Sequence, residues 1–541
     1  MAEEKKGKKK SGVFARILKW LGLGVLILLL IAGLFFQAPL KVNGLLLIFV
    51  VACTALPKKA LKWFWLSVAA VVIALIIWVF LPDETQGWRP YTFDEEQAAL
   101  EAKYAVPDSE NVAMIYNQLL EEYDSNSFYF GLVESEVEKI PMREPWSSTE
   151  HPQIAEWLQN HQGIIDTLMQ AAKKEKCRFP IPPYFDSSGR LSSMRRCAYL
   201  LITSANNDLG EGRINPALEK YFAVLQIGKH MYQQQTLIEM LVGVAIENLS
   251  LGQLNRLIVT EDLTEEHLWM VENALTKTGY DWNIKLPEVL EGEKLIAKNI
   301  WVICYEVNKD GRVRLTRNLM KAIAPQLPED MQDKAMITYA KRKFTKAFMI
   351  LLWFYMPSNP KEIGEVVDAA YEKYNEMSKP DYDWSKEPGK YSIDELFLFS
   401  LDWRRAIELS VPTFEEVFHK IHDGYLRMIA EKRGSLLIVA LRLYKNETGR
   451  WPESLDEISD LVEVETLIDP INGDSFVYKL TPENFTLYSK GKNNIDKGGE
   501  HDTVFDPNSY EMKVNVDDWL FWPPRICKSE EEKEGTDEQK Q

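Results

Sequence analysis

Three apolar stretches within the first 82 residues limit what this chain can fold into. The first stretch extends from Ile17 to Phe36 and the third from Trp63 to Leu81. Each is close to the roughly 20 residues with which a helix crosses about 30 Å of hydrocarbon. The middle stretch, Gly44 to Leu56, reaches a workable length when the residues from Pro39 onward are included. We therefore expect three transmembrane helices within residues 17–82.

Basic residues flank these stretches in a pattern that predicts their orientation. They precede the first stretch and separate the second from the third: Lys5, Lys6, Lys8, Lys9, Lys10, Arg16, Lys58, Lys59 and Lys62. Loops rich in lysine and arginine remain in the cytoplasm. We expect residues 1–16 to form a cytoplasmic tail and residues 83–541 to lie outside the cytoplasm. A secretory signal peptide is the alternative for the first stretch, but its apolar core is long and no small-residue cleavage site follows it.

The N-terminal 82 residues are basic, whereas the remainder of the chain is acidic. Residues 1–82 hold 11 of the 63 basic and 2 of the 80 acidic residues, which leaves 52 basic and 78 acidic residues for the remainder. An acidic body of this kind is repelled by phosphate backbones, so we expect no nucleic-acid partner. Hydrophobic residues form 46% of the chain, which is typical of a folded protein. The expected partners are the lipid bilayer and other envelope proteins.

Residues 83–391 show helical periodicity, with no alternation long enough to indicate a sheet. Helices are predicted to start at Asp108, His151, Leu191, Pro216, Thr236 and Thr264, and a further helix to cover Glu288 to Val307 and another Lys334 to Met356. One helix pair near residues 210–225 resembles a single hairpin of a tetratricopeptide array. Since one such unit cannot bury its own apolar face, a bundle of helix hairpins is favoured.

The pattern changes after the connecting helices in residues 392–435. Leu436 to Tyr444 carries an apolar helical face, and short alternating strands are predicted at Ser475 to Leu480 and at Asn484 to Tyr488. A loop rich in Gly, Asn and Asp follows. The segment from Asp517 to Pro524 is expected to pack its aromatic side chains onto the folded body.

These elements occur in the order ALRLYKNETGRWPESLDEI, DPINGDSFVYKL and FTLYSKGKNNIDKGGEHD. That order resembles the globular domain of the major pseudopilin of type II secretion systems, over residues 436–505. The resemblance implies a long helix, a small antiparallel sheet and a calcium-binding loop in which Ser489, Asp496 and Asp502 contact the ion. About 350 residues separate the module from the membrane stretches, so we expect a borrowed module and not a pilus subunit.

The loop also has a physical case for calcium, which prefers six to eight oxygen ligands. Oxygen-bearing side chains recur around two glycines, Gly498 and Gly499, that permit tight turns. The predicted calcium ligands are Ser489, Asn494, Asp496, Glu500 and Asp502. Lys492 would lie beside the ion and weaken its binding. Ordinary turn chemistry explains the same composition without a metal ion.

Four of the five cysteines lie outside the membrane stretches. In an oxidising compartment Cys177 and Cys197 are the expected disulfide, because the Pro-rich turn between them could bring two helices together. The alternative is four buried free thiols. Nearby arginines could receive an anion, although solvated helix ends explain them equally well. They are Arg178, Arg190, Arg195 and Arg196.

One helix carries residues that suggest a metal centre. Glu415, His419 and His422 recur at spacings of four and three residues, so they share one helix face and could ligate zinc. A core helix with flanking polar residues gives the same pattern. Motifs for metalloproteases, phosphate-binding loops, dinucleotide binding and serine hydrolases do not occur in the sequence.

The sequence thus predicts a mainly α protein with three N-terminal transmembrane helices, a large helical ectodomain (83–391), a small α+β pseudopilin-like module (436–524) and a disordered tail (525–541). It resembles large membrane proteins of the Gram-negative envelope, a resemblance that implies no particular activity. The expected function is a scaffold or interaction protein, without catalytic activity, that is anchored in the bacterial inner membrane, faces the periplasm and is linked to secretion. The alternative is an envelope metal-dependent hydrolase whose site lies in the helical ectodomain.

Overall fold

The computed structural model describes residues 47–52, 54, 57, 60, 62–68, 70, 87–123, 142–184, 189–277, 279–315, 355–386, 403–410, 413–506 and 511–524. This described part is mainly helical, as predicted, with small sheets. The chain divides into two compact units, each assembled from separate stretches. Unit 1 comprises residues 1–100, 182–187 and 290–418, and unit 2 comprises residues 101–181, 188–289 and 419–541.

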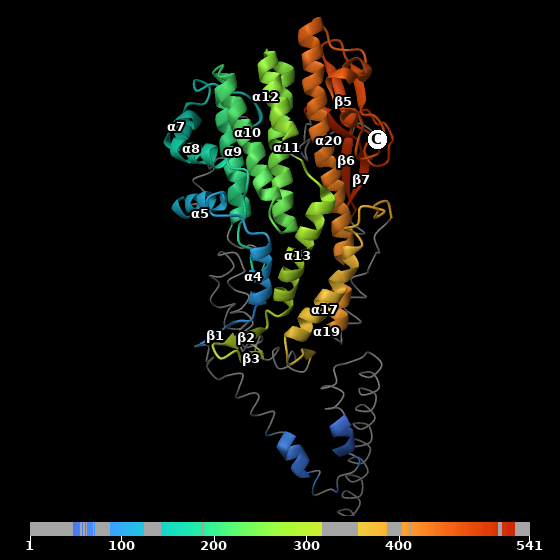
Figure 1. Cartoon of the computed structure of the whole chain (residues 1–541). Coiled ribbons are helices and arrows are strands. Elements are labelled where there is room, and N and C mark those ends of the chain that lie inside the picture. The colour runs from blue at the N-terminus through green and yellow to red at the C-terminus, as the bar shows by residue number, and fades with distance from the viewer. Residues whose placement is uncertain are drawn as a thin grey trace, which may run out of the picture. The chain divides into compact units, whose positions relative to one another are not determined.

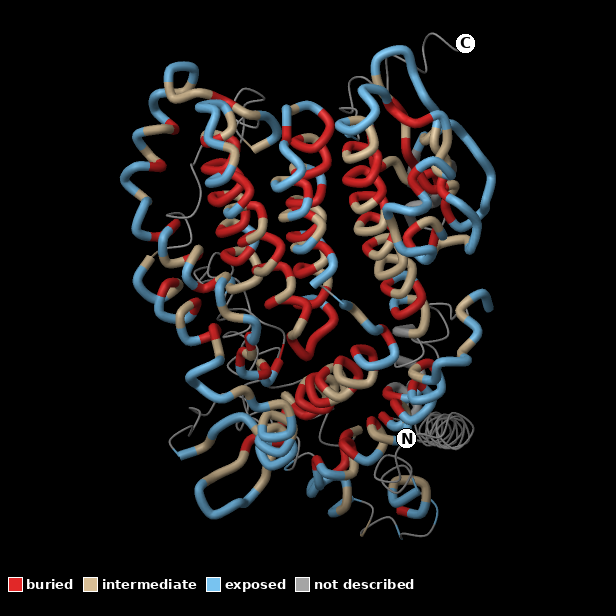
Figure 2. The backbone as a smooth tube through the Cα atoms, turned by 45° about the horizontal axis from the view of Figure 1, so that its top comes forward, coloured by how far each residue is buried: buried red, intermediate tan, exposed pale blue. Residues whose placement is uncertain are grey.

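Unit 2 is built on long helices joined by short turns. They are α9 (Arg190–Gly210), α10 (Ile214–Tyr232), α11 (Leu237–Thr260) and α12 (Glu265–Thr276), preceded by α5 (Ala113–Glu122), α7 (Pro152–Asn160) and α8 (Gln162–Ala171). The helices α9, α10 and α11 lie side by side (Figure 1). Buried residues are frequent along the length of α9, α10 and α11 (Figure 2).

Glycines allow α10 and α11 to approach closely. A Cβ atom at Gly243 would lie 2.5 Å from the backbone nitrogen of Tyr232 and 2.6 Å from the carbonyl oxygen of Gly228. A Cβ atom at Gly228 would lie 2.5 Å from Cγ of Glu247. A larger residue at Gly243 would collide with backbone atoms, so the helix crossing depends on glycine there.

The predicted starts of two helices are confirmed by their caps. The Thr236 hydroxyl accepts a hydrogen bond from the backbone N–H of Glu239 at the start of α11. At the start of α12, Thr264 and His267 form a reciprocal capping box. Each cap satisfies backbone donors that the first helical turn leaves without a partner.

Two predicted helices differ from the structure in detail. The helix expected from Asp108 begins at Ala113, because Asn111 instead binds a neighbouring segment of backbone. The single helix expected from His151 is two helices, α7 and α8, which are separated at His161. The His161 backbone leaves helical geometry, and its ring Nδ1 bonds the carbonyl of Trp157.

The C-terminal part of unit 2 combines one long helix with short strands. Helix α20 (Thr413–Thr448) continues from unit 1 into unit 2 and is followed by the 3-10 helices η4 (Leu455–Leu461) and η5 (Val464–Leu467). The strands β4 (Val477–Leu480), β5 (Phe485–Ser489) and β8 (Trp519–Trp522) form an antiparallel sheet, and β6 (His501–Asp506) pairs with β7 (Glu511–Asp517). Both strands predicted near residues 475–488 are confirmed, as is the burial of Phe521 and Trp522.

This C-terminal part shares one hydrophobic core with the long helices. Buried Leu437 of α20, Phe485 of β5 and Phe521 of β8 belong to the same cluster as Leu218 of α10 and Leu254 of α11. Residues 436–524 are therefore packed into unit 2 as an integral part of its core.

Unit 1 contains a small sheet that the sequence did not indicate. Antiparallel strands β1 (Trp88–Pro90), β2 (Tyr305–Asn308) and β3 (Val313–Leu315) accompany α17 (Lys361–Glu372), η3 (Lys373–Asn375), α19 (Trp403–Ser410) and parts of α4 (Asp94–Lys103) and α13 (Trp282–Trp301). The predicted helix from Glu288 to Val307 is wrong at its end, because α13 stops at Trp301 and residues 305–308 form β2. Strands of three or four residues are too short to show a recognisable alternation of apolar and polar residues.

The predicted transmembrane stretches lie largely outside the described residues, so three membrane helices stay a prediction. The predicted helix at Lys334 to Met356 and the C-terminal tail lie outside them too, apart from residues 355 and 356. In the part of the chain that the structure describes, α11 alone has the length and apolar composition of a membrane span. Since 56% of its apolar window is buried inside unit 2, α11 has the character of a core helix.

Candidate functional site

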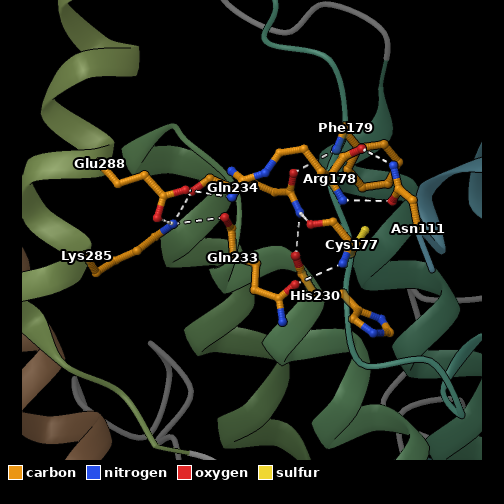
Figure 3. Close-up of polar contacts among 9 residues, drawn as sticks. All are labelled: Asn111, Cys177, Arg178, Phe179, His230, Gln233, Gln234, Lys285 and Glu288. Carbon is orange, nitrogen blue, oxygen red and sulfur yellow. Dashed lines mark hydrogen bonds and ion pairs between the residues drawn. The ribbon is translucent and has the colours of Figure 1, made fainter. Parts of the chain in front are cut away.

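An extended segment of backbone, Lys174–Ile181, follows α8 in unit 2, and we call it the clamped segment. Its peptide groups are bound by side-chain amides from distant parts of the sequence (Figure 3). Buried backbone groups require hydrogen-bond partners, which extended segments usually obtain from a neighbouring strand. Here one backbone bridge joins Asn111 to Lys176, and the side chains of Asn111, Gln233 and Gln234 bind further peptide groups in place of a strand.

Asn111 binds both peptide groups of Arg178. Its Oδ1 atom accepts a hydrogen bond from the Arg178 N–H at 2.9 Å, and its Nδ2 donates to the Arg178 carbonyl at 2.9 Å. The same Oδ1 also accepts from the N–H of Ala113 at the start of α5. Asn111 therefore fixes the clamped segment to α5.

Gln233 and Gln234 lie in the turn between α10 and α11. Gln234 donates to the Cys177 carbonyl at 3.0 Å and accepts from the N–H of Phe179 at 3.0 Å. Gln233 accepts from the N–H of Cys177 at 2.9 Å and donates to the Glu175 carbonyl at 2.8 Å. Each glutamine thus binds one carbonyl and one N–H of the clamped segment.

Lys285 of α13 holds the glutamine turn in place. Its Nζ donates to the carbonyls of Gln233 and Gln234 at 2.9 and 2.5 Å and lies 3.2 Å from Glu288. Burial lowers the pKa of Lys285 to about 8. Glu288 also pairs with Arg178 at 2.7 Å, so α13 contacts both the turn and the clamped segment (Figure 3).

His230 closes the other side of this network. Its Nε2 donates to the Lys174 carbonyl at 2.8 Å, which leaves Nδ1 as the acceptor for the Tyr116 hydroxyl. The imidazole is fully buried, and this burial lowers its pKa to about 4. A neutral ring with both nitrogens engaged has a structural role here.

A pocket of about 250 Å³ lies beside the clamped segment, and we call it the Gln235 pocket. Residues Arg178, Phe179 and Pro180 of the clamped segment line it, together with exposed Met114 of α5. Gln235, the third glutamine of the turn, also lines it and is 2% exposed. Apolar walls with a few polar groups are typical of binding sites.

Two residues that line this pocket carry buried polar atoms without hydrogen-bond partners within the described residues. They are Oε1 and Nε2 of Gln235 and Nε and Nη1 of Arg178. Each such atom costs about 1 to 3 kcal/mol of stability when it stays without a partner. A ligand that supplies the missing partners would recover this free energy on binding.

Cys177 and Cys197 are separate free thiols in the structure, so the expected disulfide between them is not formed there. Both are buried, and burial raises the pKa of the Cys197 thiol to about 12 and that of Cys177 further. Both lie near the Tyr116 ring in the core of unit 2. Their environment is that of buried apolar residues.

Two of the four arginines suggested as an anion site already have carboxylate partners. Arg178 pairs with Glu288, and Arg190 pairs with Glu239 at 2.5 Å while stacking over the Phe179 ring at 4.5 Å. Arg195 is exposed on α9.

The predicted calcium ligands have separate partners. Ser489 donates to Asp469 at 2.5 Å, and Asn494 donates to Asp474 at 2.7 Å. Asp496 accepts from the hydroxyl of Tyr488, the N–H of Gly498 and the ammonium of Lys479, which together lower its pKa to about 2. Glu500 is exposed, and the backbone of Asp502 pairs with Val516 in the β6–β7 hairpin.

Lys492 pairs with Asp423 of α20 at 2.9 Å. Within the residues that the structure describes, no three His, Cys, Asp or Glu side chains form a group that could hold a metal ion. Calcium binding by the loop stays a prediction.

The suggested zinc ligands are likewise not assembled in the described structure. His419 is buried, and the His422 ring packs against the Trp282 ring at 5.2 Å. Burial lowers the pKa of His422 to about 4. Glu415 belongs to unit 1, whereas both histidines belong to unit 2.

Sequence reasoning missed the glutamine turn and Asn111. One signal was available: the run Gln233, Gln234, Gln235 joins two apolar helices at a position where Gly, Asn, Asp or Ser usually form the turn. Its partners lie more than fifty residues away, so their spacing carried no local pattern.

Comparisons of the chain with protein-family models, with curated proteins and with solved structures find no match.

Proposed function

We propose that this chain is a membrane-anchored interaction protein of the bacterial envelope, and that unit 2 binds a partner protein in the Gln235 pocket. The three apolar N-terminal stretches and the lysines beside them support the anchor. The acidic remainder of the chain supports an extracytoplasmic body that does not bind nucleic acid. The pseudopilin-like order of residues 436–505 supports a link to secretion.

The observation that carries the proposal is the rigid wall of the Gln235 pocket. Asn111 and Gln234 bind the backbone of Arg178 and Phe179 through hydrogen bonds, which hold these residues in the pocket wall. Binding to a wall that is already ordered loses little conformational entropy. A preorganised pocket with unmet hydrogen bonds is suited to recognition of another molecule.

Site-specific photo-crosslinking tests partner binding. A photoreactive amino acid replaces Met114, which lines the pocket and is 56% exposed. The variant is the full chain, and it is irradiated in native membranes. The matched control carries it at Trp269 of α12, which is 52% exposed. We expect one discrete adduct at position 114, identified by mass spectrometry and reproduced with the purified partner. The same adducts at both positions, or none at 114, contradict the proposal.

A topology reporter tests the anchor. When fused after Gln541, a reporter that is active only outside the cytoplasm should give signal, and a cytoplasmic reporter should not. The reverse result would place the body in the cytoplasm and contradict an envelope function.

A further inference from the structure

We infer that the Gln235 pocket binds an extended peptide main chain, and that the Gln235 side chain forms hydrogen bonds to its peptide groups. This inference rests on the proposed function and names the chemistry by which the partner is recognised. It is carried by the unmet hydrogen bonds of a buried glutamine and by what its two neighbours bind in the same turn.

The chemistry of a primary amide restricts its ligand. Gln235 offers an acceptor, Oε1, and a donor, Nε2, on one planar group. Both are buried and without partners in the described structure. A carbonyl alone or an N–H alone would satisfy one of them, whereas a peptide main chain presents both groups at short spacing.

The protein itself provides the precedent. Gln233 and Gln234 each bind one carbonyl and one N–H of an extended backbone. Asn111 does the same with Arg178. Gln235 is the next residue of the same turn and lacks such a backbone, although the pocket beside it has room for one.

Other groups of the pocket fit the same ligand. Nε and Nη1 of Arg178 are donors without partners, and the main chain supplies carbonyl acceptors. Apolar Val106, Met114 and Pro180 border the same space, which favours a peptide with an apolar side chain at this point. A volume of about 250 Å³ lies just below the roughly 300 to 1,000 Å³ of pockets for drug-sized ligands, so a short stretch of peptide fills it.

The test uses random linear dodecapeptides displayed on phage and selected against the full chain in detergent. Selected peptides are then synthesised with single N-methyl groups along the backbone, because N-methylation removes one N–H and leaves the side chains unchanged. We expect one or two positions at which N-methylation weakens binding by about tenfold or more.

Gln235→Met identifies the site. Methionine has a similar shape and no amide, so we expect peptide binding to weaken by about tenfold or more while the melting temperature stays equal or rises. Gln253→Met on α11 is the control, because Gln253 donates to the carbonyl of Met142 and does not line the pocket. This control should retain the affinity of the wild type.

Three results overturn the inference: no selected peptide, binding that tolerates N-methylation at every position, or full affinity in Gln235→Met. If Gln235→Met still captures the partner that is crosslinked through position 114, the main-chain inference fails and the proposed function stands. If peptides bind through Gln235 but position 114 captures no membrane partner, the proposed function fails and the peptide site stands.

Discussion

The hydroxyl of Tyr116 lies 2.9 Å from Nδ1 of His230, and Nε2 of the same ring lies 2.8 Å from the carbonyl oxygen of Lys174. The imidazole therefore joins α5, α10 and the clamped segment while it is neutral. Because the ring is buried, protonation would place a charge in the core of unit 2.

Acid should destabilise unit 2 through His230. The pKa is 6.5 in the unfolded chain and about 4 in the folded chain, so the unfolded chain binds more protons between these values. The stabilisation is complete above pH 6.5 and is lost as the pH falls toward 4. We expect a loss of about 2 kcal/mol between pH 7 and pH 5, measured by denaturant unfolding of the full chain in detergent.

His230→Gln isolates this contribution from His422, whose pKa burial also lowers to about 4. The variant should be less stable than the wild type at pH 7, and the difference should shrink by about 2 kcal/mol at pH 5. A difference that is the same at both pH values would contradict the assignment to His230.

Asn111→Leu should destabilise unit 2 by about 2 to 4 kcal/mol. The change removes the partners of both peptide groups of Arg178 and of the Ala113 N–H. Thermal and denaturant unfolding measure the loss. Asn117→Ala, at an exposed position of α5, should change stability by less than about 0.5 kcal/mol. Similar effects of the two substitutions would show that the Asn111 side chain does not stabilise unit 2 through the clamped segment.

Two glycine substitutions in α11 should have opposite effects. Gly243→Ala places a methyl group 2.5 Å from the backbone of α10 and should destabilise the fold by about 3 kcal/mol or more. At Gly252 a Cβ atom meets nothing within 4 Å, so Gly252→Ala should stabilise the helix by about 0.5 to 1 kcal/mol. The melting temperature of each variant, compared with that of the wild type, checks both predictions. If Gly243→Ala is as stable as the wild type, the two helices do not cross as closely as described.

Both Cys177 and Cys197 should react as thiols only after unfolding. Alkylation without a reducing agent, followed by peptide mass mapping, should modify neither residue in the folded chain and both in denaturant. A linked Cys177–Cys197 peptide in the unreduced map would restore the disulfide predicted from the sequence.

Calcium binding by the loop is tested by thermal unfolding with and without the ion. If the loop binds calcium, the melting temperature rises in the wild type and the rise is absent in Asp496→Ala. Lys479→Met should enlarge the rise, because the Lys479 ammonium competes for the Asp496 carboxylate. If the melting temperature of the wild type does not change, or if it changes equally in Asp496→Ala, the loop does not bind calcium as predicted.

The sequence predicted those elements whose signals are local. The caps at Thr236 and Thr264 and the strands at residues 477–489 were foreseeable because each depends on a few adjacent residues. The start of α5 was misplaced because Asn111 serves a backbone more than sixty residues away. The short strand β2 was read as helix because it continues directly from the periodic pattern of α13.

The candidate site could not be predicted for the same reason. Gln235 has no catalytic or metal-binding pattern around it, and its importance comes from neighbours brought together by the fold. The suggested zinc ligands are the opposite case. The regular spacing of Glu415, His419 and His422 suggested a metal site, but the His422 ring packs against the Trp282 ring.

The order in which the shared core is completed has a consequence for synthesis of the chain. Leu218 and Leu254 leave the ribosome about two hundred residues before Leu437, and Phe521 follows close to the end. Until translation is nearly finished, these helix faces are only partly covered and can associate with other chains. Newly made chains that stop before residue 524 should therefore aggregate readily, bind chaperones and be degraded by proteases.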